Sequence, residues 1–375
     1  MSIADFQEYT YEYYLEKALA RVPAGIDTRE GSIIYDAIAP VAYSFAEEAM
    51  MMQQVQLNAY IQTATGEFLD YKAEEQGTRR IAATFAKVIA YFTDDSGNPL
   101  TVDIGDRFSS TGNNPIFYSV SKILENGQAE MTAEIAGVAP NKILGQLLPI
   151  TPFNHLGTAE ILNISVPARD VESDDDLRVR LLNAFKTISF GGNVADYIDK
   201  VKEIDEIGAV QVYPTWDGGG TVRLFVLDNA FNAANPQIVD IAQQAIDPTD
   251  AQGDGRGLAP IGHTVTVSPP TNKPIDVSMT VITDDFTTVT DVTPAVNAAI
   301  DDYLLSLRKM WGNLVNARQY KCIAYRSQLL VEILKVQGVV SVSDVEFNNL
   351  ADDITMTLTG QLSELPVKGS VVVNG

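Results

Sequence analysis

A chain of 375 residues with 46% hydrophobic residues can form about two to four globular domains and is too apolar for a disordered protein. Its 49 acidic and 26 basic residues give a net charge of −23, and its basic residues cluster only at Arg79-Arg80 and Arg308-Lys309. This balance disfavours binding to nucleic acid or docking on an anionic membrane, and it fits solubility or an acidic surface that docks a basic partner.

Other features of the sequence disfavour membrane-spanning, secreted, disulfide-bonded and cysteine-rich metal-binding proteins. No apolar run approaches the ~18–20 residues of a membrane span, and the N-terminus has no basic segment typical of a secretion signal. Cys322 is the single cysteine, which rules out an internal disulfide and a cysteine-rich metal site. We therefore expect that the protein is not inserted into a membrane and that it is assembled in a cytoplasm.

The N-terminal residues predict an opening helix over 3–21, ended by Pro23 and Gly25. Four tyrosines between residues 9 and 14 spread around this helix beyond its apolar stripe. Tyrosine combines contact area with a polar tip, which suits an interface. The alternative is that these tyrosines cover a small core, and the sequence leaves both interpretations open.

A second, longer helix is predicted from Ser32 to about Ile61, because its apolar residues recur at helical spacing. Pro40 should kink or break it near Ala39, since proline removes a backbone donor and clashes with the preceding turn. Three consecutive methionines at 50–52 suit packing against another chain. A short helix over 67–76 follows and is closed by a glycine.

Short strands separated by turn residues then predict a β-rich unit. Strands are expected at 86–92, 100–104, 115–124, 129–136, 146–150 and 159–166. Asn126-Gly127 is the best hairpin turn, because both residues tolerate positive φ. The acidic loop at 94–106 lacks the alternating acids and closing glutamate of an EF-hand, which disfavours a calcium site.

The acidic run at 172–176 invites a catalytic or metal-binding interpretation, but a helix start explains it without chemistry. Ser173 followed by Asp176 resembles a capping box, and acidic residues are favourable at the positive end of a helix dipole. The spacing also predicts two i,i+4 ion pairs: Asp174–Arg178 and Asp176–Arg180.

The next hundred residues predict a two-layer α/β sandwich in the order α-β-β-α-β, with its first helix capped by Asn193. Glycines at 253, 255 and 257 do not fit a phosphate loop, because a helix precedes them and a strand follows. We interpret them as a loop leading into an edge strand. His263 has no second ligand nearby and is interpreted as structural.

The last hundred residues predict another two-layer α/β unit. A strand at 275–283 precedes a helix capped by Thr293 with Pro294 at its first position. A second helix ends at Gly338, and strands at 339–347, 354–358 and 371–373 follow. Exposed edge strands in such a unit invite pairing with a neighbouring chain.

The predicted fold class is therefore α+β and multidomain. It combines an N-terminal helical bundle segment, a β-rich middle domain and two small two-layer α/β domains, with expected ranges 1–85, 86–168, 169–270 and 271–375.

Several strings, taken in order, resemble the baseplate J-like family of contractile tails. They are GSIIYDAIAP at 31–40, TATGEFLD at 63–70, Gly77-Thr78-Arg79, GVAPN at 137–141, ESDDDLRVR at 172–180 and GLAPIG at 257–262. The resemblance covers roughly residues 25–270, and the last hundred residues match only in layout.

This resemblance implies a structural baseplate wedge subunit of a phage tail or tail-like particle. Several copies would form a ring of six-fold character around the central hub and link it to sheath contraction. Helices within about 1–80 would bundle with another wedge protein and with other copies. The C-terminal α/β units would make copy-to-copy contacts, and further partners would be hub and sheath-proximal proteins.

The sequence offers no catalytic, cofactor-binding or metal-binding residues of convincing pattern. The resemblance instead marks candidate partner-interface residues in the N-terminal helices. They are Tyr11, Tyr14, Ile34, Ile38, Phe45, Met51, Met52, Val55, Phe68 and Leu69.

Two alternatives come from other functional classes. A tail-associated cell-wall glycosidase needs two carboxylates ~5–10 Å apart across a cleft, and Glu172, Asp174 and Asp284 would be its candidates. A receptor- or sugar-binding tail protein would use the β-rich unit at 86–168.

Overall fold

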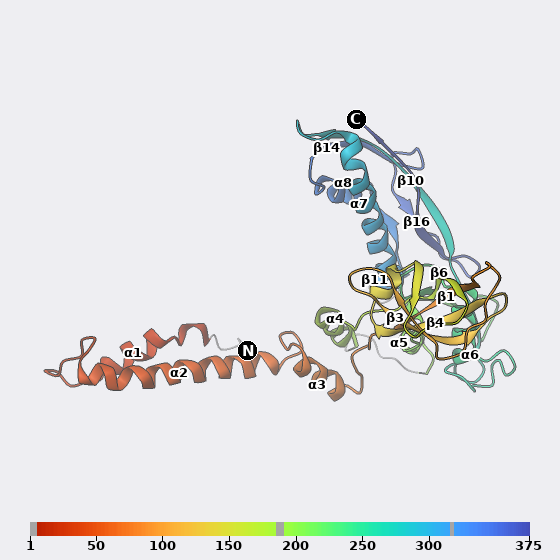
Figure 1. The fold of residues 1–375 in the computed structure, drawn as a ribbon. Helices are drawn as coiled ribbons and strands as arrows, with labels where there is room; N and C mark the ends of the chain where they lie inside the picture. The colour runs from red at the N-terminus through yellow and green to blue at the C-terminus, as the bar shows by residue number, and fades with distance from the viewer. Residues whose placement is uncertain (1–5, 185–190, 316–318) are drawn as a thin grey trace. The chain divides into compact units, whose positions relative to one another are not determined.

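The computed structural model describes residues 6–184, 191–315 and 319–375, drawn as a ribbon in Figure 1. These residues form two compact units, the first from 6–81 with 172–184 and the second from the remainder. The four ranges expected from the sequence remain a proposal. The helix that opens the expected range 169–270 belongs to the first unit, together with the N-terminal helices.

The first unit is helical. Its elements are η1 (Phe6–Glu8), α1 (Tyr11–Leu19), α2 (Ile33–Asn58), α3 (Glu67–Glu75) and α4 (Asp174–Ala184). The single opening helix expected over 3–21 is wrong, and residues 3–5 lie outside the described chain. Thr10 has an extended backbone and accepts the N–H of Tyr13 at 3.3 Å, so α1 begins anew after η1.

Pro40 does not interrupt α2, which runs as one helix of 26 residues. The helix is therefore not broken near Ala39, and the kink expected there stays a prediction. Pro40 is exposed, where solvent can satisfy the backbone carbonyl that a proline leaves without its helical donor. Ser32 begins the helix as predicted, since its side chain accepts the N–H of Tyr35 at 3.2 Å.

The short helix predicted over 67–76 is confirmed as α3. It ends in a Schellman motif, in which the Thr78 N–H bonds to the Ala73 carbonyl and the Gly77 N–H bonds to the Glu74 carbonyl. Gly77 adopts a φ of 74°, which glycine reaches without strain. A small buried cluster joins α3 to α4 and consists of Ala64, Leu69, Ala73, Leu177 and Leu181.

The second unit begins with a closed β-barrel. Its strands are β1 (Phe85–Asp94), β2 (Arg107–Ser110), β3 (Phe117–Ile123), β4 (Gln128–Ala136), β5 (Gly145–Pro149) and β6 (Leu156–Val166), with η2 (Ala139–Lys142) before β5. They pair in the order β1-β4-β3-β2-β5-β6. Alternate side chains fill the interior, where the rings of Phe92 and Phe108 lie 5.0 Å apart.

The hairpin between β3 and β4 is confirmed, with φ of 56° at Asn126 and 72° at Gly127. The strand expected at 100–104 is wrong. That part of the chain pairs only through an isolated bridge from Pro99 to Thr93, and β2 forms later instead. Proline lacks a backbone donor for a ladder, and Gly105 at a φ of 94° turns the chain before β2.

A small α/β sandwich follows. Its elements are α5 (Val194–Lys202), β7 (Ile207–Pro214), β8 (Thr221–Asp228), α6 (Pro236–Ile246) and β9 (Thr264–Ser268). The predicted order α-β-β-α-β is confirmed, with β8 pairing antiparallel to β7 and parallel to β9. Asn193 caps α5 as expected, because its side chain accepts the N–H of Asp196 at 2.8 Å.

The C-terminal part is a second α/β arrangement. Its elements are β10 (Thr271–Thr283), α7 (Val289–Met310), β11 (Leu314–Val315), β12 (Gln319–Tyr320), β13 (Ile323–Ala324), α8 (Arg326–Leu334), β14 (Val339–Phe347), β15 (Ile354–Thr355) and β16 (Glu364–Asn374). The main sheet has the order β14-β10-β16, and α7 and α8 lie beside it in Figure 1. Its buried cluster also includes Ala209, Phe225 and Leu227 from the preceding sandwich.

The predicted start of α7 is wrong. Thr288, not Thr293, is the N-cap, and it forms a capping box with Asp291. The hydroxyl of Thr293 bonds back to the carbonyl of Val289 at 2.6 Å, inside the helix. Pro294 therefore lies in the second turn rather than at the first position.

Candidate functional site

The exposed apolar face of α2 is the first candidate site. The residues of α2 that are buried are small or polar: Ala42, Ala46, Ala49 and Asn58. Most of its large apolar side chains are exposed instead, among them Val55 at 72% and Met50 at 70%. We call this set the arm surface; it comprises Ile33, Val41, Tyr43, Phe45, Met50, Met51, Met52 and Val55. A helix that is apolar around most of its circumference is normally buried, and a large exposed apolar patch marks an interaction site.

The alanine spacing explains why the larger side chains stay outside. Alanines at i, i+4 and i+7 form a narrow groove along which α1 packs, with Leu15 buried against it. The rings of Tyr14 and Phe45 lie 5.6 Å apart, and those of Tyr11 and Tyr43 lie 6.4 Å apart. Helix α1 has only nine residues, so it covers part of α2, and even Tyr43 and Phe45, whose rings it contacts, stay 57% and 49% exposed.

The predicted interface residues occupy three different environments. Phe45, Met51, Met52, Val55 and Phe68 are exposed, while Tyr11, Tyr14, Ile34 and Ile38 are half-buried. Leu69 is fully buried between α3 and α4, so it does not belong to an exposed surface of the free chain. Sequence reasoning did not select Ile33, Val41, Tyr43 or Met50 as interface residues, although each is a large apolar residue of the same predicted helix.

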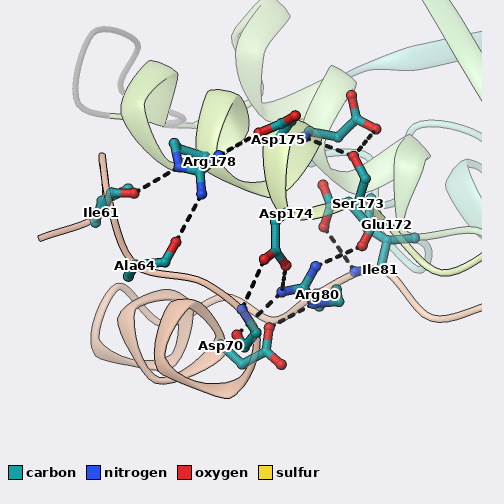
Figure 2. Close-up of polar contacts among 12 residues, drawn as sticks. Ile61, Ala64, Asp70, Arg80, Ile81, Glu172, Ser173, Asp174, Asp175 and Arg178 are labelled. Atoms are coloured by element: carbon teal, nitrogen blue, oxygen red, sulfur yellow. Dashed lines mark hydrogen bonds and ion pairs between the residues drawn. The ribbon is translucent and has the colours of Figure 1, made fainter. Parts of the chain in front are cut away.

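The second candidate site is a polar network in the first unit, which we call the arginine clamp; Figure 2 shows its part around Arg80 and Arg178. It comprises Arg80, Arg178 and Arg180 and the groups that they bond. The side chains of these arginines are 16%, 18% and 30% exposed. Together they bond α4 to three segments: α3, the turn before α3 and the chain after α3.

Arg80 bonds to α3 and α4 at once. Its Nε donates to Asp70 and its Nη2 to Asp174, each at 2.7 Å, and its Nη1 reaches the carbonyl of Glu172 at 2.7 Å. Asp174 in turn accepts the N–H of Gly66 at 2.9 Å, which caps α3 from a distant part of the chain. This N–H and the Arg80 guanidinium lower the pKa of Asp174 against the opposing effect of burial.

Ser173 is the N-cap of α4 as predicted, since its hydroxyl accepts the N–H of Asp176 at 3.1 Å. The two predicted i,i+4 ion pairs are wrong. Arg178 pairs with Asp175 at 2.5 Å rather than with Asp174, and Arg180 binds the carboxylate of Glu172 at 2.7 and 2.8 Å. The reason is that the guanidinium groups reach backbone carbonyls and acids of other segments, which intrahelical spacing does not reveal.

The carboxylates proposed for a glycosidase are engaged in structural contacts. Glu172 binds Arg180 and also accepts the N–H of Ile81 at 3.1 Å. Asp174 belongs to the arginine clamp, and Asp284 accepts the hydroxyl of Thr287 at 2.7 Å in a turn. Across residues 6–184, 191–315 and 319–375, no three His, Cys, Asp or Glu side chains gather closely enough to hold a metal ion.

The histidine, cysteine and glycine residues discussed from the sequence have structural roles. The ring Nδ1 of His263 lies 2.9 Å from the hydroxyl of Tyr197, so this histidine packs as predicted. Burial raises the pKa of Cys322 to about 11, which keeps the thiol protonated. A side chain at Gly257 would clash with the carbonyls of Ile246 and Ala245, so this glycine serves the close approach of its loop to α6.

None of the helices in the described part of the chain combines the length and the apolarity that crossing a bilayer requires.

Comparison with known proteins places these features in a family. Residues 189–269, which contain α5, β7, β8, α6 and β9, match the family model described as "Baseplate J-like central domain". The chain is 32% identical over 369 residues to "Uncharacterized protein YqbT" of Bacillus subtilis, an alignment that covers 98% of both proteins.

Two further relatives carry descriptive names. The "Phage-like element PBSX protein XkdT" of Bacillus subtilis is 30% identical over 359 residues, covering 95% of this chain and 98% of that protein. The "Baseplate protein gp47" of Escherichia phage Mu is 30% identical over 219 residues, covering 53% of this chain and 57% of that protein. The similarity at this identity over nearly the whole chain shows that the protein belongs to the baseplate J-like family.

Proposed function

We propose that this chain is a structural subunit of the baseplate of a contractile tail or tail-like particle, in the wedge around the central hub. Its family membership supports this, as do the names of a baseplate protein of phage Mu and a protein of the PBSX phage-like element. The observation that carries the proposal is the arm surface, because eight large apolar side chains exposed on one helix mark a surface that a partner covers.

The partner of the arm surface would be helical. Helix α2 spans 26 residues and presents apolar side chains at helical spacing, which suits packing against other helices in a bundle. Three adjacent exposed methionines add flexible, polarizable contacts that adapt to more than one packing. The bundle would contain helices of another wedge protein and of further copies of this chain.

The second unit would make the copy-to-copy contacts that close a ring. Strands β14 and β16 form the two edges of their sheet, and an open edge can accept a strand or a loop of a neighbour. Contacts of this kind would link the wedge to the hub and to sheath-proximal proteins. Assembly would take place in the bacterial cytoplasm, and the finished subunit would reside in the baseplate.

The test is a charge substitution on the arm surface in cells that produce the particle. The double variant Met51→Glu/Val55→Glu places two carboxylates where apolar contact is proposed, since these side chains are 66% and 72% exposed. We expect electron microscopy to show no assembled tails. A matched control, Ile104→Glu/Leu144→Glu, alters two side chains of similar exposure on barrel loops, at 68% and 61%.

The control should assemble normally. Particles that assemble with the Met51→Glu/Val55→Glu chain in place would contradict the proposed bundle. Complete absence of the wild-type chain from purified particles, measured by mass spectrometry, would contradict the baseplate role itself. Particles that assemble with the Ile104→Glu/Leu144→Glu chain but no longer adsorb would instead indicate that the barrel binds the host.

A further inference from the structure

The turn between α2 and α3, residues 59–65, joins two parts of the first unit. Helices η1 and α1 pack along α2, whereas α3 packs on α4. The buried cluster between α3 and α4 includes Ala64, with Ile61 packed against it, and among the described residues it takes no member from α2. The direction in which α2 leaves the α3–α4 pair therefore depends on how this turn is held.

Arg178 of α4 holds the turn by its backbone. Its Nε donates to the carbonyl of Ile61 at 3.1 Å and its Nη2 to the carbonyl of Ala64 at 2.9 Å, as Figure 2 shows. Its Nη1 donates to Asp175 at 2.5 Å, which orients the guanidinium from within α4. A guanidinium is planar and donates in a fixed fork, so these bonds fix the turn in position and in angle.

The other two arginines of the clamp bond to segments outside residues 59–65, although Arg80 reaches the carbonyl of Gly66, the next residue, at 3.5 Å. Arg80 joins Asp70 of α3 to Asp174 of α4, and Arg180 binds Glu172 and the chain that follows α3. Together with the apolar cluster, they hold α3 and α4 together whether or not Arg178 is bonded to the turn. Release of Arg178 would leave the turn held by the packing of Ala64 and Ile61, and would therefore loosen the direction of α2 without separating α3 from α4.

We propose that Arg178 is a latch: a positioning residue that fixes the angle between α2 and the α3–α4 pair. The turn at 59–65 is the joint at which the α1–α2 arm swings when the latch opens. Water can replace the guanidinium at the two carbonyls, so the closed and open arrangements exchange similar numbers of hydrogen bonds. The use of such a swing for switching in a baseplate rests on the proposed function, whereas the latch itself is a property of the isolated chain.

The test measures a distance across the joint by pulsed electron spin resonance. Spin labels are attached at Glu48→Cys on α2 and Glu67→Cys on α3, both exposed, in a chain that also carries Cys322→Ala. Labelled chain is diluted into unlabelled chain so that only distances within one molecule contribute. We expect one narrow distance distribution for the parent and at least a twofold broader one for Arg178→Gln.

Arg79→Gln is the matched control, because the Arg79 side chain is 87% exposed and its one carboxylate contact, to Glu74, is 3.9 Å long. It should leave the distribution narrow. Arg178→Lys keeps the charge but not the fork, and it should broaden the distribution by an intermediate amount. If Arg178→Gln loses its helical circular dichroism, the Arg178→Lys variant carries the test.

An unchanged distribution in a folded Arg178 variant would overturn the latch, as would equal broadening in Arg79→Gln. Neither result bears on the proposed function, because the measurement involves no partner and no particle. Conversely, normal particle assembly by Met51→Glu/Val55→Glu would contradict the bundle and leave the latch standing.

Discussion

The two units of the chain are stabilised in different ways. The second unit has three large buried clusters, whose fully buried side chains include Trp311, Phe92 and Leu224. In its described residues the first unit has one small cluster, of which only three members, Leu69, Leu177 and Leu181, are larger than alanine. It compensates with arginine contacts to backbone carbonyls and acids, and it leaves the apolar side of α2 uncovered.

This difference indicates which unit requires partners. A unit that buries its own apolar side chains is stable alone, whereas one that exposes them depends on another chain to cover them. Under the proposed function, the arginine clamp would maintain the geometry of the first unit before a partner binds. Substitutions in the cores, at two acids, in the clamp and on the arm surface test this difference between the units.

The largest effect is expected from the small core of the first unit. Leu177→Ala removes one of its three large side chains and should lower the stability of that unit by about 2–5 kcal/mol. Limited proteolysis should then cleave residues 59–81 while the barrel and the α/β parts stay intact. The control is Val201→Ala in the sandwich, which should leave that cleavage rate unchanged. Equal destabilisation of both units by Leu177→Ala would show that they do not unfold separately.

Substitution of a buried aspartate in the second unit should give the next largest change in stability. Burial raises the pKa of Asp228 to about 6, although the N–H groups of Asn232 and Ala230 and the charge of Arg308 oppose this. A raised carboxylate pKa means that the folded state binds the proton more tightly than the unfolded state between pH 4 and 6. This residue therefore makes stability fall as pH rises through that window, and the loss persists above it.

The corresponding variant is Asp228→Asn, which keeps an oxygen that can accept the N–H groups of Ala230 and Asn232. As the pH rises from 4 to 8, the free energy of unfolding of the variant should increase relative to that of wild type by on the order of 2–3 kcal/mol. Urea unfolding of the second unit at both pH values measures this. An identical pH dependence for variant and wild type would contradict the account of Asp228.

The arginine clamp should show the opposite pH dependence. Arg80→Gln removes bonds to Asp70 and Asp174 and should destabilise the first unit by about 1.5–3 kcal/mol at pH 7. Because the pKa of Asp174 is lowered in the folded state, its contribution is present above its unfolded value near 4 and is lost as pH falls through the folded value. The cost of Arg80→Gln should therefore shrink in acid, as thermal unfolding at pH 7 and pH 3 can measure. A cost independent of pH would exclude this link.

The smallest effect on the isolated chain is expected at the arm surface. Met51→Glu/Val55→Glu changes two side chains that are mostly exposed, so the unfolding free energy should change by no more than about 0.5 kcal/mol. Thermal unfolding of the isolated chain checks this. A large destabilisation would mean that these side chains already support the fold of the monomer.

Much of the fold could be predicted because local patterns determine it. The Asn126-Gly127 turn, the Asn193 cap and the α-β-β-α-β order were all predicted from residues close together in the sequence. The errors have local causes as well. The start of α7 was misplaced because Thr288 with Asp291 and Thr293 with Pro294 are both acceptable helix starts, and the capping box prevailed.

The site was less predictable, because it depends on contacts across long separations. Spacing along α4 paired Arg178 with Asp174, whereas the folded chain offers it carbonyls more than a hundred residues away. Spacing along α2 revealed its apolar residues but not which side α1 would cover. Leu69 was selected with the interface candidates because one helix in isolation does not reveal that α4 buries it.

Light-scattering mass after size exclusion shows whether the arm surface binds a partner. The chain is measured alone and co-expressed with the products of genes adjacent to its own, as wild type and as Met51→Glu/Val55→Glu. If a partner covers the arm surface, wild type should form a mixed assembly, and the variant should remain a folded chain without partners. A wild-type chain that remains a monomer with every neighbour, or a variant that assembles equally well, would contradict this expectation.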